Sequence, residues 1–376
     1  MSTTRRVAAA VGLAALIVVV TTTPAAAHTL SGAPPTNYRS EIQSVSQGGD
    51  GIRVRLRNLG RQVELRNASA TDVVVLGYDG EPYLRIGPEG AFENRRSPTT
   101  YLNRTGSPAP PAGTDSSAAP DWHRMSTSHT VSWRDRRTRW EGADPPQVTA
   151  RPDEVHVVVP SWKIELRQGD QAITVTGRIL YVPPAGAAPW VAVAVVLGLA
   201  AAAAGWPRSW PALLSGMVAI LIAVDLVHST GLAAFDASGT GEVLLRLLGR
   251  NTVAPVVWAL GIWSIAGLQR GEDRAVLVAI GVAIVIALVG GLSDVAALTR
   301  SQLPFAYAPV TARAAVAASM GLGVGIAAGG VVALRRHLPV SARPAPARSS
   351  PPPASSRARP ARGRPSTRRP AARPRR

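Results

Sequence analysis

The chain has 376 residues, contains no cysteine and carries a formal net charge of +18. The absence of cysteine excludes disulfides, thiolate metal sites and cysteine nucleophiles. Thirteen arginines between residues 335 and 376 and two more at Arg5 and Arg6 leave only +3 for the rest, so the charge describes the chain ends and not a nucleic-acid-binding body.

Residues 1–27 have the three parts of a secretory signal peptide. Arg5 and Arg6 precede the apolar run VAAAVGLAALIVVV (7–20), and small residues follow at 25–27. This run is shorter than the roughly 20 residues of a membrane span, which favours cleavage over an uncleaved anchor. We expect cleavage after Ala27, which makes His28 the first residue of the mature chain.

Residues 28–186 are predicted to form an extracytoplasmic, all-β, sandwich-like domain. In GIRVRLRNLG (51–60) apolar residues alternate with arginines, and similar runs recur with Gly, Asn, Asp and Pro between them. This pattern indicates about seven or eight antiparallel strands. The segment 95–150 is rich in Pro, Ser, Ala and Arg with little periodicity, which predicts a long inserted loop, partly disordered at 106–120.

A helical bundle of about five transmembrane helices is predicted over residues 187–336. The apolar stretches are 188–205, 209–228, 252–268, 275–293 and 312–334.

The arginines predict the orientation of these helices. With the β domain outside, an odd number of spans places the C-terminus in the cytoplasm of a multi-pass plasma-membrane protein. Arg208, Arg270, Arg274, Arg335 and Arg336 then lie inside, as the positive-inside rule requires. Arg246, Arg250 and Arg300 would lie outside, which is a partial exception.

The segment 337–376 is predicted to be a disordered, Pro/Arg-rich cytoplasmic tail, because it has no apolar run that could form a core. Its expected partner is the anionic headgroup layer of the bilayer, where each nearby arginine contributes about 1 kcal/mol. No nucleic-acid partner is expected.

Four residues outside the membrane could bind copper. A free α-amine and imidazole at His28 form a chelate that suits copper, and DWHRMSTSH (121–129) offers His123, His129 and the soft ligand Met125. If this segment is a strand, all three lie on one face. The alternative is a frayed terminus and ordinary surface side chains.

Asp225 and His228 form a second candidate site. They are three residues apart in a predicted span and therefore share a helix face. Ionisable residues in spans usually face a bundle interior, so one interpretation is a route for protons, ions or copper. The sequence favours the other interpretation, in which both lie within four residues of the outer end and meet headgroup water. Asp294, at the outer end of the fourth stretch, could neighbour them.

An enzyme is not expected. No nucleophile elbow is present, so no catalytic and no cofactor-binding residues are assigned, and copper is the only candidate cofactor. GLGVGIAAGG (321–330) imitates a dinucleotide-binding fingerprint, but it lies within an apolar span, which favours close helix packing.

Two resemblances follow from quoted motifs. With the leader, the β domain and the spans, LGYDGEPYLRIGPEGAFENRRSPTTYLNR (76–104) resembles a group of uncharacterised actinobacterial membrane proteins over residues 40–300, which implies no activity. AAAHTL (25–30) is similar to the mature start of CopC-type copper-resistance proteins, which implies a β-sandwich whose N-terminal histidine binds Cu(II) and a membrane partner. The internal ligand motif of that family is missing.

Two functions therefore remain open. The first is copper binding or handling at the cell envelope. The second is a non-catalytic envelope anchor whose β domain binds another protein. A membrane enzyme ranks last.

Overall fold

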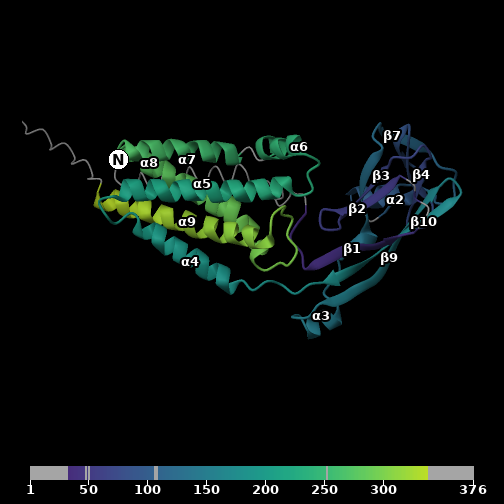
Figure 1. Ribbon diagram of the computed structural model, residues 1–376, viewed down its shortest axis with the longest axis horizontal. Coiled ribbons are helices and arrows are strands. Elements are labelled where there is room, and N and C mark those ends of the chain that lie inside the picture. The colour runs from purple at the N-terminus through teal and green to yellow at the C-terminus, as the bar shows by residue number, and fades with distance from the viewer. Residues whose placement is uncertain (1–32, 47–48, 50, 106–108, 251–252, 338–376) are drawn as a thin grey trace, which may run out of the picture. The chain divides into compact units, whose positions relative to one another are not determined.

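The computed structural model describes residues 33–46, 49, 51–105, 109–250 and 253–337 (Figure 1). The predicted signal peptide, His28 and the tail from residue 338 lie outside the described residues. The chain divides into two compact units, residues 1–339 and 340–376, and the described residues all belong to the first.

The N-terminal part is an antiparallel β domain. Its strands form a seven-stranded sheet in the order β1-β10-β9-β4-β5-β6-β7 and a three-stranded sheet in the order β2-β3-β8. The strands are β1 (Tyr38–Val45), β2 (Ile52–Arg57), β3 (Gln62–Asn67), β4 (Val73–Leu76), β5 (Pro82–Gly87), β6 (Gly90–Asn94), β7 (Trp122–Ser126), β8 (Thr130–Arg134), β9 (His156–Gln168) and β10 (Gln171–Tyr181).

Both sheets contribute to one hydrophobic core. In β2 the alternation read from the sequence holds, because Arg53 and Arg55 are exposed while Val54 and Leu56 turn toward the core. Apolar side chains of the two sheets pack together, including Val63, Leu65, Val131 and Trp133 of the small sheet and Val75, Ile164, Leu166 and Val175 of the large one. Two sheets over a shared core explain why period-2 alternation is the main signal of this domain.

The segment 95–150 is not the long loop that the sequence predicts. It contains α2 (Pro98–Thr105), strands β7 and β8, the short helix η1 (Arg136–Thr138) and α3 (Pro146–Ala150). Strand β7 lies at a sheet edge and buries none of its side chains, so it has no apolar alternation to detect. Residues 109–120 form turns, one of which is held by the amide of Asp115 donating to the carbonyl of Arg96.

All five predicted apolar stretches are helical. The helices are α4 (Ala188–Ala203), α5 (Trp210–Ala234), α6 (Thr240–Leu245), α7 (Val253–Gln269), α8 (Asp273–Ile286) and α9 (Pro309–Arg336), with π-helical turns η2 (Arg246–Arg250) and η3 (Ala287–Gly291) and the 3-10 segment η4 (Leu292–Leu298).

Fewer helices are long enough to count as membrane spans than the five that the sequence predicts. Among the residues that the structure describes, three helices are long and apolar enough to cross a membrane, namely α5, the continuous segment Asp273–Leu298 and α9. A fourth is reached if α6, η2 and α7 count as one bent span, and the apolar α4 has only 16 residues. Five spans are therefore not established by helix length.

Small residues bring α4 and α9 into close contact. A methyl carbon added at Gly325 would lie 2.3 Å from the carbonyl oxygen of Gly198, and one at Gly321 would lie 2.2 Å from that of Ala194. The glycine-rich run of α9 is thus a helix-packing surface, as the sequence predicted.

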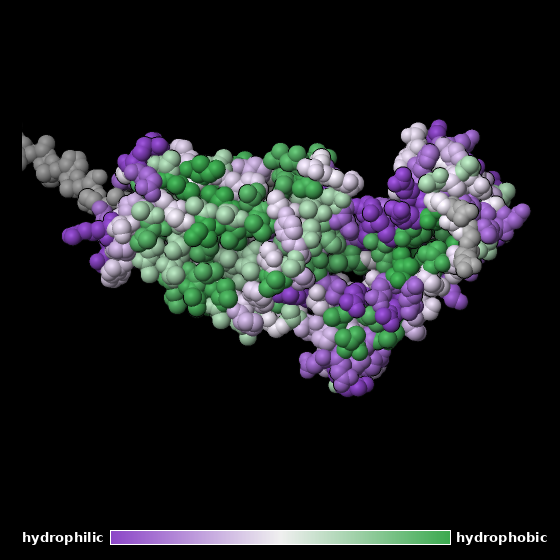
Figure 2. All heavy atoms as spheres, in the orientation of Figure 1, coloured by the Kyte–Doolittle hydropathy of each residue, from purple (hydrophilic) through white to green (hydrophobic). Residues whose placement is uncertain are grey.

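The helices expose large apolar side chains on their outer surface. On α4, Val196 is 64% and Leu199 is 68% exposed, and α7 exposes Ile262 at 62%. Figure 2 shows such hydrophobic residues over much of the helical region. An apolar surface of this extent fits contact with lipid and not with water.

Candidate functional site

Helix α5 carries Asp225 and His228 on its buried face, where they are 5% and 3% exposed. The prediction that they share a face is confirmed. The helix continues to Ala234, six residues beyond the end of the predicted stretch at 228. His228 therefore lies about 9 Å before the end of α5, at 1.5 Å per residue.

Asp225 is held between α7 and the π-helical turn η3. The indole N–H of Trp258 donates to Oδ2 of Asp225 at 2.7 Å. Gly290 of η3 lies against the other carboxyl oxygen, since an added methyl carbon there would be 2.6 Å from Oδ1. A π-helical turn is a local break of the kind often found at functional sites.

His228 is paired with Asp294, the neighbour that the sequence suggested. Nε2 of His228 lies 2.8 Å from Oδ2 of Asp294. Asp294 has non-helical backbone angles (φ −104°, ψ 15°) within η4, so the fourth apolar stretch is interrupted where it supplies this carboxylate. The ring of Phe305 stacks on the imidazole, with centroids 5.9 Å apart.

The second ring nitrogen of His228 is left unsatisfied by the described residues. Within the described part of the chain, Nδ1 of His228 is buried without a hydrogen-bond partner. His228 and Asp294 line a cavity of about 20 Å³ together with apolar residues that include Leu232 and Phe305. This volume is enough for one water molecule, which would add a polar partner beside the pair.

The segment after η4 connects this pair to the β domain. The backbones of Gln302 and Thr36 donate to each other's carbonyls, at 2.8 and 3.0 Å. The hydroxyl of Ser301 donates to the carbonyl of Val182 at 3.0 Å. Residues 301–305 thus contact the entry to β1, the exit from β10 and, through Phe305, the ring of His228.

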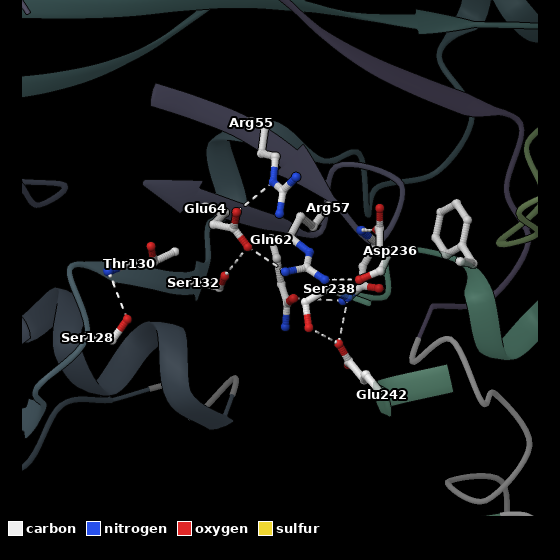
Figure 3. A network of polar contacts seen from close by, with 12 residues as sticks. Arg55, Arg57, Gln62, Glu64, Ser128, Thr130, Ser132, Asp236, Ser238 and Glu242 are labelled. Atoms are coloured by element: carbon white, nitrogen blue, oxygen red, sulfur yellow. Dashed lines mark hydrogen bonds and ion pairs between the residues drawn. The ribbon is translucent and has the colours of Figure 1, made fainter. Parts of the chain in front are cut away.

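A second contact joins the β2–β3 turn to the loop after α5 (Figure 3). The amide of Asn58 donates to the carboxylate of Asp236, and Arg57 donates to the Asp236 carbonyl. Asn58, Leu59 and Asp236 are the non-glycine residues with positive φ among the described residues, at 51°, 56° and 53°. Asn58 and Leu59 have this conformation within the β2–β3 turn, where tight hairpins favour it.

Glu64 anchors the strand side of this contact. It accepts hydrogen bonds from Arg55 at 2.6 Å and from Arg57. Burial alone would raise the pKa of Glu64, but these hydrogen bonds and the two positive charges outweigh burial and hold the pKa below its usual range.

The proposed copper ligands are placed as follows. His123 and Met125 are exposed, two residues apart on strand β7, and so point to the same side. His129 lies in the turn between β7 and β8, so the expectation that it shares their strand face is wrong. His28 lies outside the described residues. No group of three or more His, Asp or Glu that could hold a metal occurs among the residues searched, which are the described ones.

No protein-family model, no curated protein and no solved structure matches the chain. The two resemblances read from the sequence therefore stay predictions, and a function has to be argued from geometry.

Three parts of the site escaped the sequence analysis. Trp258 is a residue with one polar atom in an apolar helix, and that atom could have suggested a buried acceptor. Phe305 and the Asn58–Asp236 contact gave no local signal, because their partners lie far away in the sequence.

Proposed function

We propose that this protein is an integral membrane protein in which a proton on the buried His228–Asp294 pair is coupled to the position of an extracytoplasmic β domain. The observation that carries the proposal is the segment 301–305, which contacts both the β domain and the imidazole ring. A contiguous contact of this kind gives a route for coupling, and its strength has to be measured.

The proposed mechanism depends on the charge of the pair. With Nδ1 unprotonated, the neutral imidazole donates to an aspartate and leaves a net negative charge in a buried site. A proton on Nδ1 makes the pair neutral overall, with imidazolium and carboxylate 2.8 Å apart. Because an uncompensated buried charge is costly, loss of this proton favours entry of water beside the ring and displacement of Phe305.

The proposal includes the orientation derived from the sequence. The β domain is placed outside, the tail in the cytoplasm, and α4 is taken as a fifth span. The exposed valines and leucine of α4 and its close contact with α9 support its inclusion, although it has only 16 residues.

A cysteine introduced at Leu303 tests the coupling, because Leu303 lines the cavity and the chain has no other cysteine. The full chain in nanodiscs is labelled with a maleimide across a pH series, and Ser161→Cys, at an exposed position of strand β9, corrects for thiolate formation. We expect the corrected rate at Leu303→Cys to rise as the pair loses its proton. Asp294→Asn should abolish this pH dependence.

A corrected rate that changes with pH equally in the presence and absence of Asp294→Asn would refute the coupling. So would a rate that does not change with pH at all. Either result would leave the function of a non-catalytic anchor whose β domain binds another envelope protein.

Copper handling is a second candidate, favoured by one observation. His123 and Met125 are both exposed on the same side of edge strand β7, with Met125 48% exposed, and could act together as soft ligands. The test is copper titration of the mature full chain, with cleavage before His28 confirmed by mass. Tight binding should be lost when one residue is added before His28 or when His123 and Met125 are replaced by alanine; binding indifferent to both changes contradicts this candidate.

A further inference from the structure

The outer face of the small sheet is strongly basic. Direct cross-strand partners share a face, and three rows lie on the side away from the core: Arg53–Arg66–Thr130, Arg55–Glu64–Ser132 and Arg57–Gln62–Arg134. We call these nine residues the basic sheet face. It holds five arginines against one glutamate, a net charge of +4.

The arginines of this face are unequally compensated. At the centre of the face, the Glu64 carboxylate accepts hydrogen bonds from Arg55 and Arg57 and offsets part of their charge. The side chains of Arg53, Arg66 and Arg134 are exposed and make no hydrogen bond or ion pair with any described residue. Arg53 and Arg66 are direct cross-strand partners, and like charges in that arrangement destabilise a sheet unless an anion lies between them.

The basic sheet face begins where the β domain contacts the helices. Arg57, at the end of β2, donates to the carbonyl of Asp236, two residues after α5 ends. Figure 3 shows Arg55, Arg57 and Glu64 beside Asp236 and Glu242.

We propose that the basic sheet face binds the phosphate groups of anionic lipids in the bilayer that holds the helices. Arginine is suited to this ligand, because its planar guanidinium donates two parallel hydrogen bonds to a phosphate. Basic groups next to a bilayer are attracted to anionic headgroups, and the effect disappears within about 10 Å of the surface. The contact with the end of α5 supplies this proximity. The inference rests on the membrane placement of the bundle but not on proton coupling.

The test uses the full chain with a nitroxide on Ser132→Cys, an exposed residue within the basic sheet face. The protein is placed in nanodiscs of phosphatidylcholine alone or mixed with phosphatidylglycerol. Collision of the nitroxide with a nickel chelate carried on lipid headgroups measures its closeness to the bilayer. We expect more frequent collision in phosphatidylglycerol discs, decreasing as salt is added. Incorporation into discs separately tests the membrane placement.

Two triple variants distinguish binding by the basic sheet face from an effect of the net charge of the whole chain. Arg53→Gln/Arg66→Gln/Arg134→Gln should abolish the phosphatidylglycerol effect, with about a fivefold loss in the docked-to-undocked ratio for each arginine. Arg95→Gln/Arg151→Gln/Arg167→Gln removes the same charge from exposed positions elsewhere and should retain it. Circular dichroism of each variant confirms folding.

Three results would overturn the proposal. One is equal collision in both kinds of disc. Another is equal loss of the effect in both triple variants. The third is that inorganic phosphate, added at constant ionic strength, lowers the collision rate in phosphatidylglycerol discs to that in phosphatidylcholine discs, because the face would then prefer free anions to lipid.

Discussion

Replacing Gly325 with alanine should push α4 away from α9. The new methyl carbon would lie 2.3 Å from the carbonyl oxygen of Gly198 and 2.7 Å from the methyl of Ala201. Ordinary contact begins at 3.4 Å, so the two helices must separate by about 1 Å. Both clashing groups belong to rigid helix, and no flexible side chain can move aside instead.

The cost of this separation can be bounded. Overpacking of a well-packed interface costs about 1–3 kcal/mol. A gap of about 1 Å also removes up to half of the dispersion energy of each contact across the seam. We therefore expect the population in which α4 is detached to rise by about fivefold to 150-fold.

A local assay is needed, because a chain with a β domain and a bundle need not unfold in one step. Ala204, at the end of α4, is 5% exposed and distant from Gly325 in sequence. Maleimide labelling of Ala204→Cys in nanodiscs measures opening of α4 alone. The matched control is Gly216→Ala in α5, where an added methyl carbon meets nothing within 4 Å.

Labelling should accelerate with Gly325→Ala and stay unchanged with Gly216→Ala. If Gly325→Ala labels no faster than the control, α4 does not pack on α9 through these glycines. The argument for α4 as a membrane helix would then lose its main support.

Three further outcomes are expected. Ser132→Cys and Ser350→Cys should react with an impermeant maleimide from opposite sides of the membrane if there are five spans, whereas reaction from one side would mean an even number. Trp258→Phe should destabilise the bundle by about 1.5–3 kcal/mol, because it leaves the Asp225 carboxylate without its hydrogen-bond donor. The control is Trp263→Phe, at an exposed position of α7, and equal destabilisation by the two variants would contradict a role for this hydrogen bond. The folded-state pKa of Glu64 lies below 4.5, so its ion pairs stabilise the β domain above that pH. This stabilisation is lost as the pH falls through the folded-state pKa. Glu64→Gln should therefore flatten the acid side of the stability–pH curve measured on the full chain, whereas the exposed Glu154→Gln should not.

The sequence predicts best where one side chain faces core and the next faces solvent. Strand β2 is an example, since its arginines and apolar residues lie on the two faces that alternation requires. The shared face of Asp225 and His228 was also predictable, because three-residue spacing on a helix fixes it, whereas their burial was not, since α5 continues to Ala234. In both cases the information is local and needs no knowledge of distant partners.

Prediction failed where structure depends on distant contacts. Strand β7 exposes its side chains and is defined by pairing with β6, with Phe92 opposite Arg124. The fourth apolar stretch reads as one regular helix, yet it changes to π and 3-10 geometry at 287–298. That break places Asp294 against His228, a residue 66 positions earlier.

Residues with positive φ lie at the contact between the β2–β3 turn and the loop after α5, which is part of the proposed coupling. A non-glycine residue with positive φ costs about 1–3 kcal/mol and persists only where surrounding contacts hold it. Asn58 and Leu59 have positive φ within the β2–β3 turn, where tight hairpins favour that conformation, and Asp236 has it in the loop after α5, where it accepts from Asn58 and Arg57. In the proposed coupling, a change in charge at the pair would reach the β domain by two routes: through α5, which Asp236 follows, and through Phe305.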